Sequence, residues 1–280
     1  MKTIVLCPNV KRDNDLEYSR ALKALLEERG YRVLVSPVYG HSDKLEETPL
    51  HEALEGASLV VTLGGDGTIL RAAPLVMHSG VPIVGVNLGH KGFLACLGRE
   101  DMEEVPRIAE GECVIIPRMM LDVELYRGGR LVFSDTAIND AVVSGVVQNV
   151  TLTAYGDEDR VFTFSGDGII VSSPTGATGY SLSAGGPLVE PGAEAILLTP
   201  ICAHDLAARS FVLASERRVT IVPEELGERR CILTVDGRGT IDLRDGDRIV
   251  VTKSEYSTLL VQTRAKSFYD TAFEKLGERK

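Results

Sequence analysis

Tryptophan is absent from the 280-residue chain, and aromatic residues make up only 5% of it. The core must therefore be built mainly from Val, Leu, Ile and Ala. Basic residues are also scarce relative to acidic ones, 30 against 40, which gives a net charge of −10. This charge argues against nucleic acid as a partner, because binding it calls for a basic face. A nucleotide is still allowed, since a small ligand needs only a local site.

The chain also lacks Cys-x-x-Cys pairs, and its five cysteines are odd in number and widely spaced. This spacing disfavours both a zinc site and a disulfide framework. No apolar run approaches the ~20 residues of a membrane span, and the N-terminus lacks the apolar core and cleavage site of a signal peptide. We therefore expect a cytoplasmic protein with reduced thiols and no membrane partner.

Continuously apolar segments alternate with helical patterns in the first third of the chain. A capping box at Asn14 and Glu17 predicts the start of the first helix, and Gly30 predicts its end. Apolar strands separated by helices indicate a parallel sheet covered on both faces. The predicted strands are Thr3–Cys7, Tyr31–Ser36, Leu59–Leu63 and Val81–Val86.

The pattern changes from about Pro117. Apolar residues now alternate with polar ones, and turn signals such as Arg127–Arg130 and Asp236-Gly237 separate short segments. This pattern is typical of antiparallel strands joined by hairpins. The second part of the chain is therefore predicted to be mostly β, and the helical spacing of Lys266–Leu276 predicts a final helix that packs back on the first part.

The segment from Asp167 to Gly186 reads DGIIVSSPTGATGYSLSAGG. An apolar strand pattern gives way to a loop in which Ser172–Gly186 contains seven hydroxyl side chains and four glycines. Glycine lets a ligand approach the backbone closely, and hydroxyls both donate and accept hydrogen bonds. The loop suits a polyhydroxylated or phosphorylated small molecule; the alternative is a mobile surface turn.

A second segment, Gly64–Thr68, reads GGDGT between a buried strand pattern and an apolar helix pattern. A glycine turn at a helix N-terminus presents free N–H groups to a phosphate. Asp66 at its centre is a poor phosphate ligand, but a carboxylate there can accept the proton of a hydroxyl nucleophile. The alternative is that Asp66 only caps the helix.

A third feature is Asn139-Asp140, two polar residues within an apolar strand pattern. A buried Asn-Asp pair requires hydrogen-bond partners. The pair therefore indicates either a ligand site or a β-turn or bulge whose backbone satisfies these side chains.

These three motifs, in this order, resemble the NAD kinases, especially the bacterial ones. The likeness spans about Leu59 to Gly237 and includes Val86–Gly89 and Asp236-Gly237. GGDGT alone also occurs in phosphofructokinases and in lipid kinases, from which the Thr-Gly-Tyr loop separates this chain. The resemblance implies an ATP-dependent kinase that phosphorylates the 2′-hydroxyl of the adenosine ribose of NAD, with a divalent cation such as Mg²⁺.

The same resemblance implies an α/β fold in two domains. Residues 1–115 would form a Rossmann-like α/β domain carrying GGDGT, with 264–280 packing back on it, and 116–263 a mostly-β, NAD-binding domain. The active site would lie between them, in a homo-oligomer, dimer or tetramer. A lipid or sugar kinase sharing GGDGT and a non-catalytic NAD-binding sensor are the alternatives.

Residue roles are carried over by motif match. Asp66 would be the catalytic base, and the substrate-binding residues would be Gly67, Arg71, Asn139, Asp140, Asp167, Thr178, Gly179, Tyr180, Ser183 and Cys202. Arg71 would lie near phosphates and Asp167 near the nicotinamide end, where a contact across a subunit interface is also allowed. No residue is predicted as a metal ligand. The chain departs from the family pattern at Ser165, Ser173, Ala177, Gly179, Lys91 and Arg238.

Overall fold

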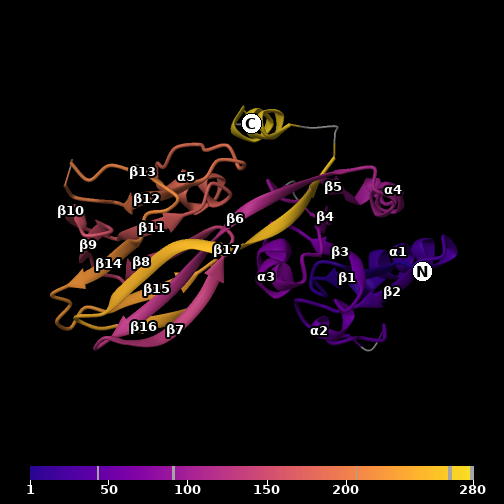
Figure 1. Cartoon of the computed structure of the whole chain (residues 1–280), viewed down its shortest axis with the longest axis horizontal. Coiled ribbons are helices and arrows are strands. Elements are labelled where there is room, and N and C mark those ends of the chain that lie inside the picture. Colours follow the sequence, from indigo (N-terminus) through magenta and orange to yellow (C-terminus); the bar gives the residue numbers. More distant parts are fainter. Residues whose placement is uncertain (43, 90–91, 206, 264–266, 278–280) are drawn as a thin grey trace. The chain divides into compact units, whose positions relative to one another are not determined.

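The computed structural model describes residues 1–42, 44–89, 92–205, 207–263 and 267–277 of the chain. Its contacts divide the chain into two compact units (Figure 1). Unit 1 consists of Met1–Pro117 and Thr258–Lys280, and unit 2 of Arg118–Ser257. Strands β6 (Val114–Arg127) and β17 (Arg248–Gln262) contain residues of both units.

Unit 1 is built on a parallel sheet. Its strands lie in the order β2 (Arg32–Val35), β1 (Thr3–Pro8), β3 (Ala57–Gly64) and β4 (Ile83–Asn87), with β5 (Leu97–Gly98) and the end of β17 beside β4. The four apolar strands predicted from the sequence are thereby confirmed, with ends that differ by at most two residues.

The helices of unit 1 connect strands, except for α6, which follows the last strand of the chain. They are η1 (Asn14–Leu16), α1 (Glu17–Glu28), α2 (Leu50–Ala53), α3 (Asp66–Val76), η2 (Met77–Ser79), η3 (Arg99–Asp101), α4 (Glu104–Glu110) and α6 (Phe268–Gly277).

Helices cover both faces of the sheet, as the apolar strands predict. Leu22 of α1 and Val105 of α4 join Val84 of β4 in one apolar cluster. The next residue, Gly85, points to the opposite face, because side chains alternate along a strand. Ile69 of α3 packs there, and a Cβ on Gly85 would lie 2.6 Å from its Cδ1.

The predicted capping box at Asn14 and Glu17 is wrong. Asp15 and Leu16 adopt left-handed φ values of 55° and 53°, so the chain makes one more turn before α1 begins. The carboxylate of Asp13 consequently faces the free N–H groups of the first turn and accepts two of them at 2.9 and 3.0 Å. The cap is thus set by a backbone turn that residue spacing did not reveal.

Unit 2 is a sandwich of two largely antiparallel sheets. One has the order β13 (Phe211–Ala214), β12 (Ala195–Ile201), β11 (Gly168–Ser172), β8 (Asp140–Gly145), β15 (Cys231–Val235) and β16 (Arg238–Leu243). The other contains β10 (Asp159–Gly166), β9 (Val150–Gly156), β14 (Val219–Glu224) and β17, with β6 and β7 (Arg130–Ala137) paired beside β17.

A single apolar core joins the inner faces of these sheets, including Val123 and Leu152 from one and Val143, Ile169 and Leu233 from the other. Short helical turns η4 (Gly176–Thr178) and α5 (Tyr180–Ser183) follow β11. An α/β unit followed by a mostly-β unit is the predicted fold class. Within the described ranges, none of the helices has the length and apolar character needed to cross a bilayer.

Candidate active site

The GGDGT segment joins β3 to α3. β3 ends at Gly64, extended Gly65 is the N-cap, and Asp66 is the first residue of the helix. The hydroxyl of Thr68 accepts the N–H of Gly65 at 3.3 Å, and the carbonyl of Gly65 accepts the N–H of Thr68 at 2.9 Å. Gly64 cannot carry a side chain, because a Cβ would lie 2.2 Å from the Thr68 hydroxyl. The glycines thus serve a tight turn.

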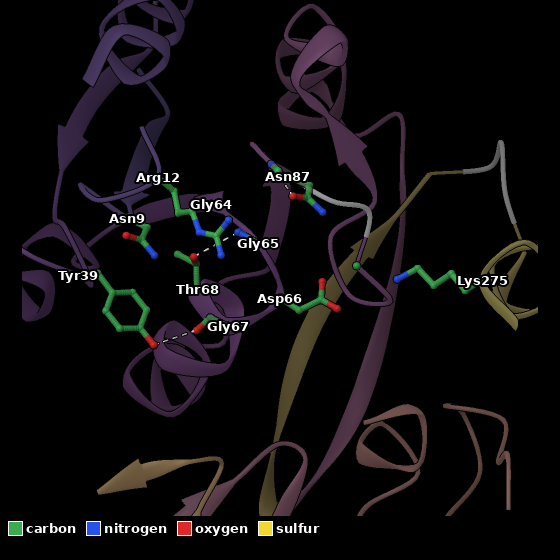
Figure 2. Close-up of a pocket in the computed structure, with 12 residues that line it drawn as sticks. Asn9, Arg12, Tyr39, Gly64, Gly65, Asp66, Gly67, Thr68, Asn87 and Lys275 are labelled. Carbon is green, nitrogen blue, oxygen red and sulfur yellow. Dashed lines mark hydrogen bonds between the residues drawn. The ribbon is translucent and has the colours of Figure 1, made fainter. Parts of the chain in front are cut away.

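A cavity of about 490 Å³ opens at this turn (Figure 2). Asn9 follows β1, Asn87 ends β4 and the GGDGT turn follows β3, so the cavity lies at the carboxyl ends of neighbouring parallel strands. Ligands of open α/β sheets bind at this edge. The lining residues are Asn9, Arg12, Tyr39, Gly64, Gly65, Asp66, Gly67, Thr68, Asn87, Gly89, Gly92 and Lys275.

The carboxylate of Asp66 is held by three consecutive backbone amides. Oδ2 accepts the N–H of Phe93 at 2.6 Å, and Oδ1 accepts those of Leu94 and Ala95 at 3.2 and 3.1 Å. A Cβ on Gly92 would lie only 1.7 Å from Oδ1, so this loop can close on the acid only with glycine there. Asp66 makes no cap hydrogen bond to its own helix, which rules out the capping alternative.

Two cations among the described residues line the same cavity. Figure 2 shows Lys275 of α6 pointing toward Asp66, and its ammonium lies 4.1 Å from the centroid of the Phe93 ring. Burial lowers the pKa of Lys275, and the negative charge of Asp66 opposes that shift. The second cation is Arg12, whose guanidinium approaches Gly89 so closely that a Cβ there would lie 3.3 Å from Nη1.

Arg71, predicted to lie near phosphates, is exposed and is not one of the lining residues. Its guanidinium lies 4.8 Å from the centroid of the Tyr39 ring, and Tyr39 does line the cavity. Gly67, also predicted, is a lining residue, and its carbonyl accepts the Tyr39 hydroxyl at 3.5 Å. The structure thus places Gly67 and Asp66 in one cavity. Arg71 does not line this cavity but contacts the ring of Tyr39, which does.

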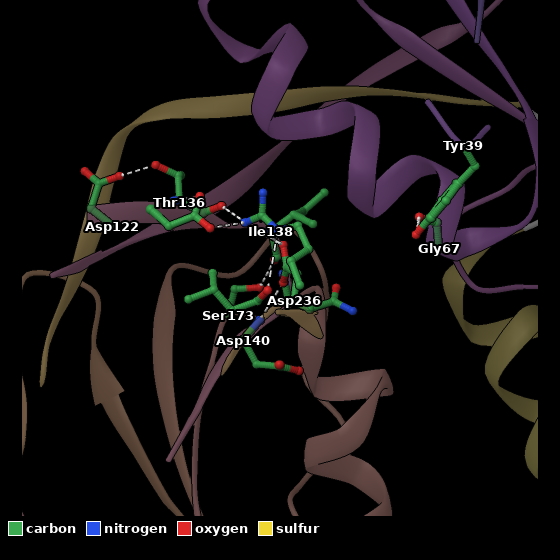
Figure 3. A network of polar contacts seen from close by, with 12 residues as sticks. Tyr39, Gly67, Asp122, Thr136, Ile138, Asp140, Ser173 and Asp236 are labelled. Atoms are coloured by element: carbon green, nitrogen blue, oxygen red, sulfur yellow. Dashed lines mark hydrogen bonds and ion pairs between the residues drawn. The ribbon is translucent and has the colours of Figure 1, made fainter. Parts of the chain in front are cut away.

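In unit 2, Asn139 lies between β7 and β8. Asp140 is the first residue of β8 (Figure 3). The buried carboxylate of Asp236 accepts the N–H groups of Ile138, Asn139 and Asp140 at 2.8 to 3.0 Å. Burial and the charge of Asp236 raise the pKa of Asp140 to about 7. The side-chain oxygen of Asn139 is buried and has no hydrogen-bond partner among the described residues. A bulge satisfied by backbone alone does not explain this pair.

The hydroxyl-rich loop divides into a buried half and an accessible half. Ser172–Ala177 are buried, and the Ser173 hydroxyl donates to the carbonyl of Ile138 at 2.5 Å, so a surface turn does not describe this half. Tyr180 is 48% exposed and Ser183 is exposed, while Thr178 and Gly179 are half-buried. The predicted binding residues of the loop therefore lie on its accessible half.

Asp167 and Cys202 come together on the surface of unit 2. The thiol of Cys202 donates a hydrogen bond to the carboxylate of Asp167, and this bond and the negative charge raise the pKa of the thiol. Cys202 has a left-handed φ of 48° at the end of β12. A neutral thiol beside an exposed carboxylate can bind a polar ligand but is a weak nucleophile.

A protein-only metal cage is not found among the described residues, which contain no cluster of three or more His, Cys, Asp or Glu side chains suited to a metal ion. The oxygen donors lining the cavity include the Asp66 carboxylate and the Asn9 and Asn87 amides. This set fits Mg²⁺, which commonly binds through one or two carboxylates together with the phosphates of a substrate.

Sequence reasoning missed Asn9, Arg12, Tyr39, Asn87 and Lys275 as lining residues. A signal for the two asparagines was present, since each comes at the end of a predicted parallel strand, where ligands of α/β sheets bind. Arg12 and Tyr39 lie in irregular segments, and Lys275 is more than 200 positions away along the chain, so no spacing pattern connects them to GGDGT.

Comparisons with known proteins show the family of the chain. The ATP-NAD kinase N-terminal domain matches residues 4–112 and the ATP-NAD kinase C-terminal domain matches residues 116–263. The chain is 37% identical to the NAD kinase of Acetivibrio thermocellus, over 100% of this chain and 98% of that one. It is 38% identical to the NAD kinase of Moorella thermoacetica, over 99% and 90% respectively.

Solved structures share the fold. An NAD kinase from Archaeoglobus fulgidus in complex with ATP superposes with a TM-score of 0.73 at 25% identity, covering 99% of both chains. Yeast NADH kinase complexed with NADH superposes with a TM-score of 0.86 at 24% identity, covering 100% of this chain and 89% of that one. With both family models matched across nearly its whole length, the chain belongs to the NAD kinase family.

Proposed function

We propose that this protein is an ATP-dependent NAD kinase, which transfers the γ-phosphoryl group of ATP to the 2′-hydroxyl of the adenosine ribose of NAD. The products are NADP and ADP. Membership of the family and the curated relatives named NAD kinase support this activity.

The observation that carries the proposal is the carboxylate of Asp66 in the cavity at the GGDGT turn. A carboxylate offers about four lone-pair sites, and the three amides of residues 93–95 occupy three of them. One site on Oδ2 is left to accept the proton of a hydroxyl group. Asp66 thus acts as general base: it removes that proton while the hydroxyl oxygen attacks phosphorus and the bond to the ADP oxygen breaks.

Groups around the acid suit a phosphorylated donor. Arg12 and Lys275 are cations lining the cavity, and the free N–H groups at the start of α3 attract an anion. A divalent cation, Mg²⁺ in the first instance, would bind with the donor phosphates and neutralise part of their charge. The Asn9 and Asn87 oxygens are the protein groups suited to hold it, because the remaining site of Asp66 is assigned to the hydroxyl group.

We assign recognition of NAD to unit 2. Asn139 and Asp140 bind the adenine-ribose part, Asp167 and Cys202 bind the nicotinamide end, and the accessible half of the loop, with Thr178, Gly179, Tyr180 and Ser183, lines the nucleotide pocket. Gly67 assists at the phosphates directly, whereas Arg71 acts there through the Tyr39 ring that it contacts. The buried, unpartnered oxygen of Asn139 supports the first assignment, because a buried polar group needs a hydrogen-bond partner.

Two broader assignments accompany the activity. Residues 1–115 together with 264–280 serve phosphoryl transfer, and residues 116–263 bind NAD. The protein acts as a homo-oligomer. A reducing, cytoplasmic location is supported by five cysteines that are all free.

The test is to incubate the purified protein with NAD, ATP and Mg²⁺ and to measure NADP with an NADP-specific dehydrogenase. We expect NADP in proportion to the ADP released. Parallel incubations replace NAD with a diacylglycerol or a hexose, and phosphorylation of either in place of NAD would favour the lipid or sugar kinase. Binding of NAD with no NADP formed would instead favour a non-catalytic sensor.

A further inference from the structure

One carboxylate, that of Asp236, holds the backbone of the Asn139-Asp140 segment. Its Oδ1 accepts the N–H groups of Asn139 and Asp140 at 2.8 and 3.0 Å, and its Oδ2 accepts that of Ile138 at 2.9 Å (Figure 3). The side chain is 0% exposed. Asp236 is therefore inaccessible to a ligand, and any effect it has on substrate must pass through the residues it holds.

The carbonyl groups of the same three residues are also bound. The Ser173 hydroxyl donates to the carbonyl of Ile138 at 2.5 Å, and its N–H donates to that of Asn139 at 2.8 Å. The N–H of Asp236 donates to the carbonyl of Asp140 at 2.9 Å. Every backbone donor and acceptor of Ile138–Asp140 thus has a protein partner.

The two side chains of this segment are in the opposite situation. The oxygen of Asn139 is buried with no partner in the described part of the chain. Asp140 is 7% exposed, and its strongest charged neighbour is Asp236, a like charge rather than a cation. A segment whose backbone is fully bound while the Asn139 oxygen has no partner among the described residues, and Asp140 faces a like charge, is suited to present these side chains to a ligand.

The hairpin that carries Asp236 is itself fixed. Asp236 and Gly237 have left-handed φ values of 47° and 66°, which form a tight turn between β15 and β16. Arg238 then donates to the carbonyl of Thr136 at 2.6 Å and lies 3.2 Å from the carboxylate of Asp135 on β7. Arg238 also lies 3.9 Å from Asp236 and partly balances its buried charge. These contacts hold the carboxylate against the segment from a second direction.

We propose that Asp236 is a positioning residue for NAD: its buried carboxylate fixes the backbone of Ile138–Asp140 so that the side chains of Asn139 and Asp140 meet the adenosine end of the dinucleotide. This rests on the proposed function, because it assumes that those two side chains bind NAD. It assigns Asp236 no contact with ATP and no part in proton transfer.

The test compares Asp236→Ala, which removes all three hydrogen bonds, with Asp236→Asn, which keeps Oδ1 but puts an NH₂ group where Oδ2 accepts the N–H of Ile138. We expect the KM for NAD, and the Kd for NAD measured by calorimetry, to rise at least tenfold in the alanine variant and about threefold to tenfold in the asparagine variant. The KM for ATP should change less than twofold in both. Asp242→Asn is the matched control, because this aspartate lies on the same hairpin with its side chain 64% exposed and paired with Arg230.

Thermal unfolding of each variant shows whether it is folded, and the asparagine variant decides the matter if the alanine variant does not fold. Equal changes in both KM values, or an unchanged Kd for NAD in a folded variant, would overturn the positioning role. If the wild-type protein binds NAD but forms no NADP, the kinase proposal fails while the Kd values still decide the role of Asp236. Loss of NAD binding by the wild type would overturn both.

Discussion

Asp66 in unit 1 and Asp236 in unit 2 are bound in the same manner, since each carboxylate accepts three consecutive backbone N–H groups. Their surroundings differ. Asp66 is partly exposed in a cavity that also contains Lys275, whereas Asp236 is fully buried, and burial raises its pKa while the amide bonds and Arg238 oppose that shift.

This difference shows that the same hydrogen-bond pattern can serve opposite purposes. At Asp66 the amides orient an acid that a hydroxyl group can still reach. At Asp236 no ligand can reach the acid, and the carboxylate orients the amides, which carry Asn139 and Asp140. In the roles proposed above, exposure, and not the pattern of bonds, separates the group that acts from the group that positions.

The largest effect is expected at Asp66. Asp66→Asn removes the proposed general base, and we expect turnover to fall by at least ~10²-fold, the usual contribution of such a group. The Kd for NAD should stay within about twofold, because NAD is assigned to residues of unit 2. NADP formation under saturating substrates and calorimetry with NAD are the measurements.

The matched control is Asp15→Asn, at an aspartate of unit 1 whose side chain is 78% exposed. Its turnover should be that of the wild type. If Asp66→Asn turned over as fast as this control, Asp66 would be a structural residue like Asp236, and the contrast between the two would disappear.

The loop that holds Asp66 gives the next effect. In Gly92→Ala the new Cβ would lie 1.7 Å from Oδ1 of Asp66, so the acid or the loop must move. A shift of about 1 Å in a catalytic group can reduce turnover by up to ~10²-fold, and we expect a loss of about 10- to 100-fold in kcat with the protein still folded.

Gly192→Ala is the control, because no atom lies within 4 Å of a Cβ placed there. Equal kcat values for the two alanine variants would mean that the amides of residues 93–95 do not orient the acid. Thermal unfolding of both variants distinguishes this result from a general loss of stability.

The fold and the motifs of the site could be predicted because they depend on local patterns. Continuous apolar strands identified the parallel sheet, hairpin signals identified the β unit, and Gly64–Thr68 identified the turn that holds Asp66. Family resemblance added the role of each motif, and the family comparisons confirmed the fold class and the membership.

The partners of the two aspartates could not be predicted. Asp66 binds amides 27 to 29 residues further along the chain, and Asp236 binds amides 96 to 98 residues earlier. Such contacts arise from tertiary packing and leave no periodicity in the sequence. The Asp13 cap was missed for a related reason, since it depends on left-handed φ values at Asp15 and Leu16, which are uncommon for residues other than glycine.

The two buried acids of unit 2, Asp140 and Asp236, predict a pH dependence of the free energy of unfolding. The pKa of Asp140 is raised to about 7, so between its ordinary value of 3.8 and about 7 the folded protein binds a proton that the unfolded chain has released. Stability is therefore expected to fall as the pH rises through this window, by about 2 kcal/mol between pH 5 and pH 8. Urea unfolding at the two pH values measures it.

In Asp140→Asn the decrease in unfolding free energy from pH 5 to pH 8 should be smaller than in the wild type. It should not be absent, because burial also raises the pKa of Asp236. Asp242→Asn, at an exposed aspartate, should keep the wild-type pH dependence. The role of Asp140 would be contradicted if the free energy of unfolding rose between pH 5 and pH 8. It would also be contradicted if the free energy of unfolding of Asp140→Asn decreased over this range as steeply as that of the wild type.

The smallest effect concerns the hydroxyl of Thr175 in unit 2, the unit that also contains Asp236. Oγ1 of Thr175 is buried and has no partner within the described residues, whereas the equally buried Thr153 shares a 2.9 Å hydrogen bond with Thr163. Removing an unpaired hydroxyl relieves a desolvation cost, while removing a paired one leaves its partner unsatisfied. Without NAD we expect Thr175→Val to gain up to about 1 kcal/mol in unfolding free energy and Thr153→Val to lose about 1 kcal/mol. Equal losses in urea unfolding would show that Thr175 has a partner in the free protein.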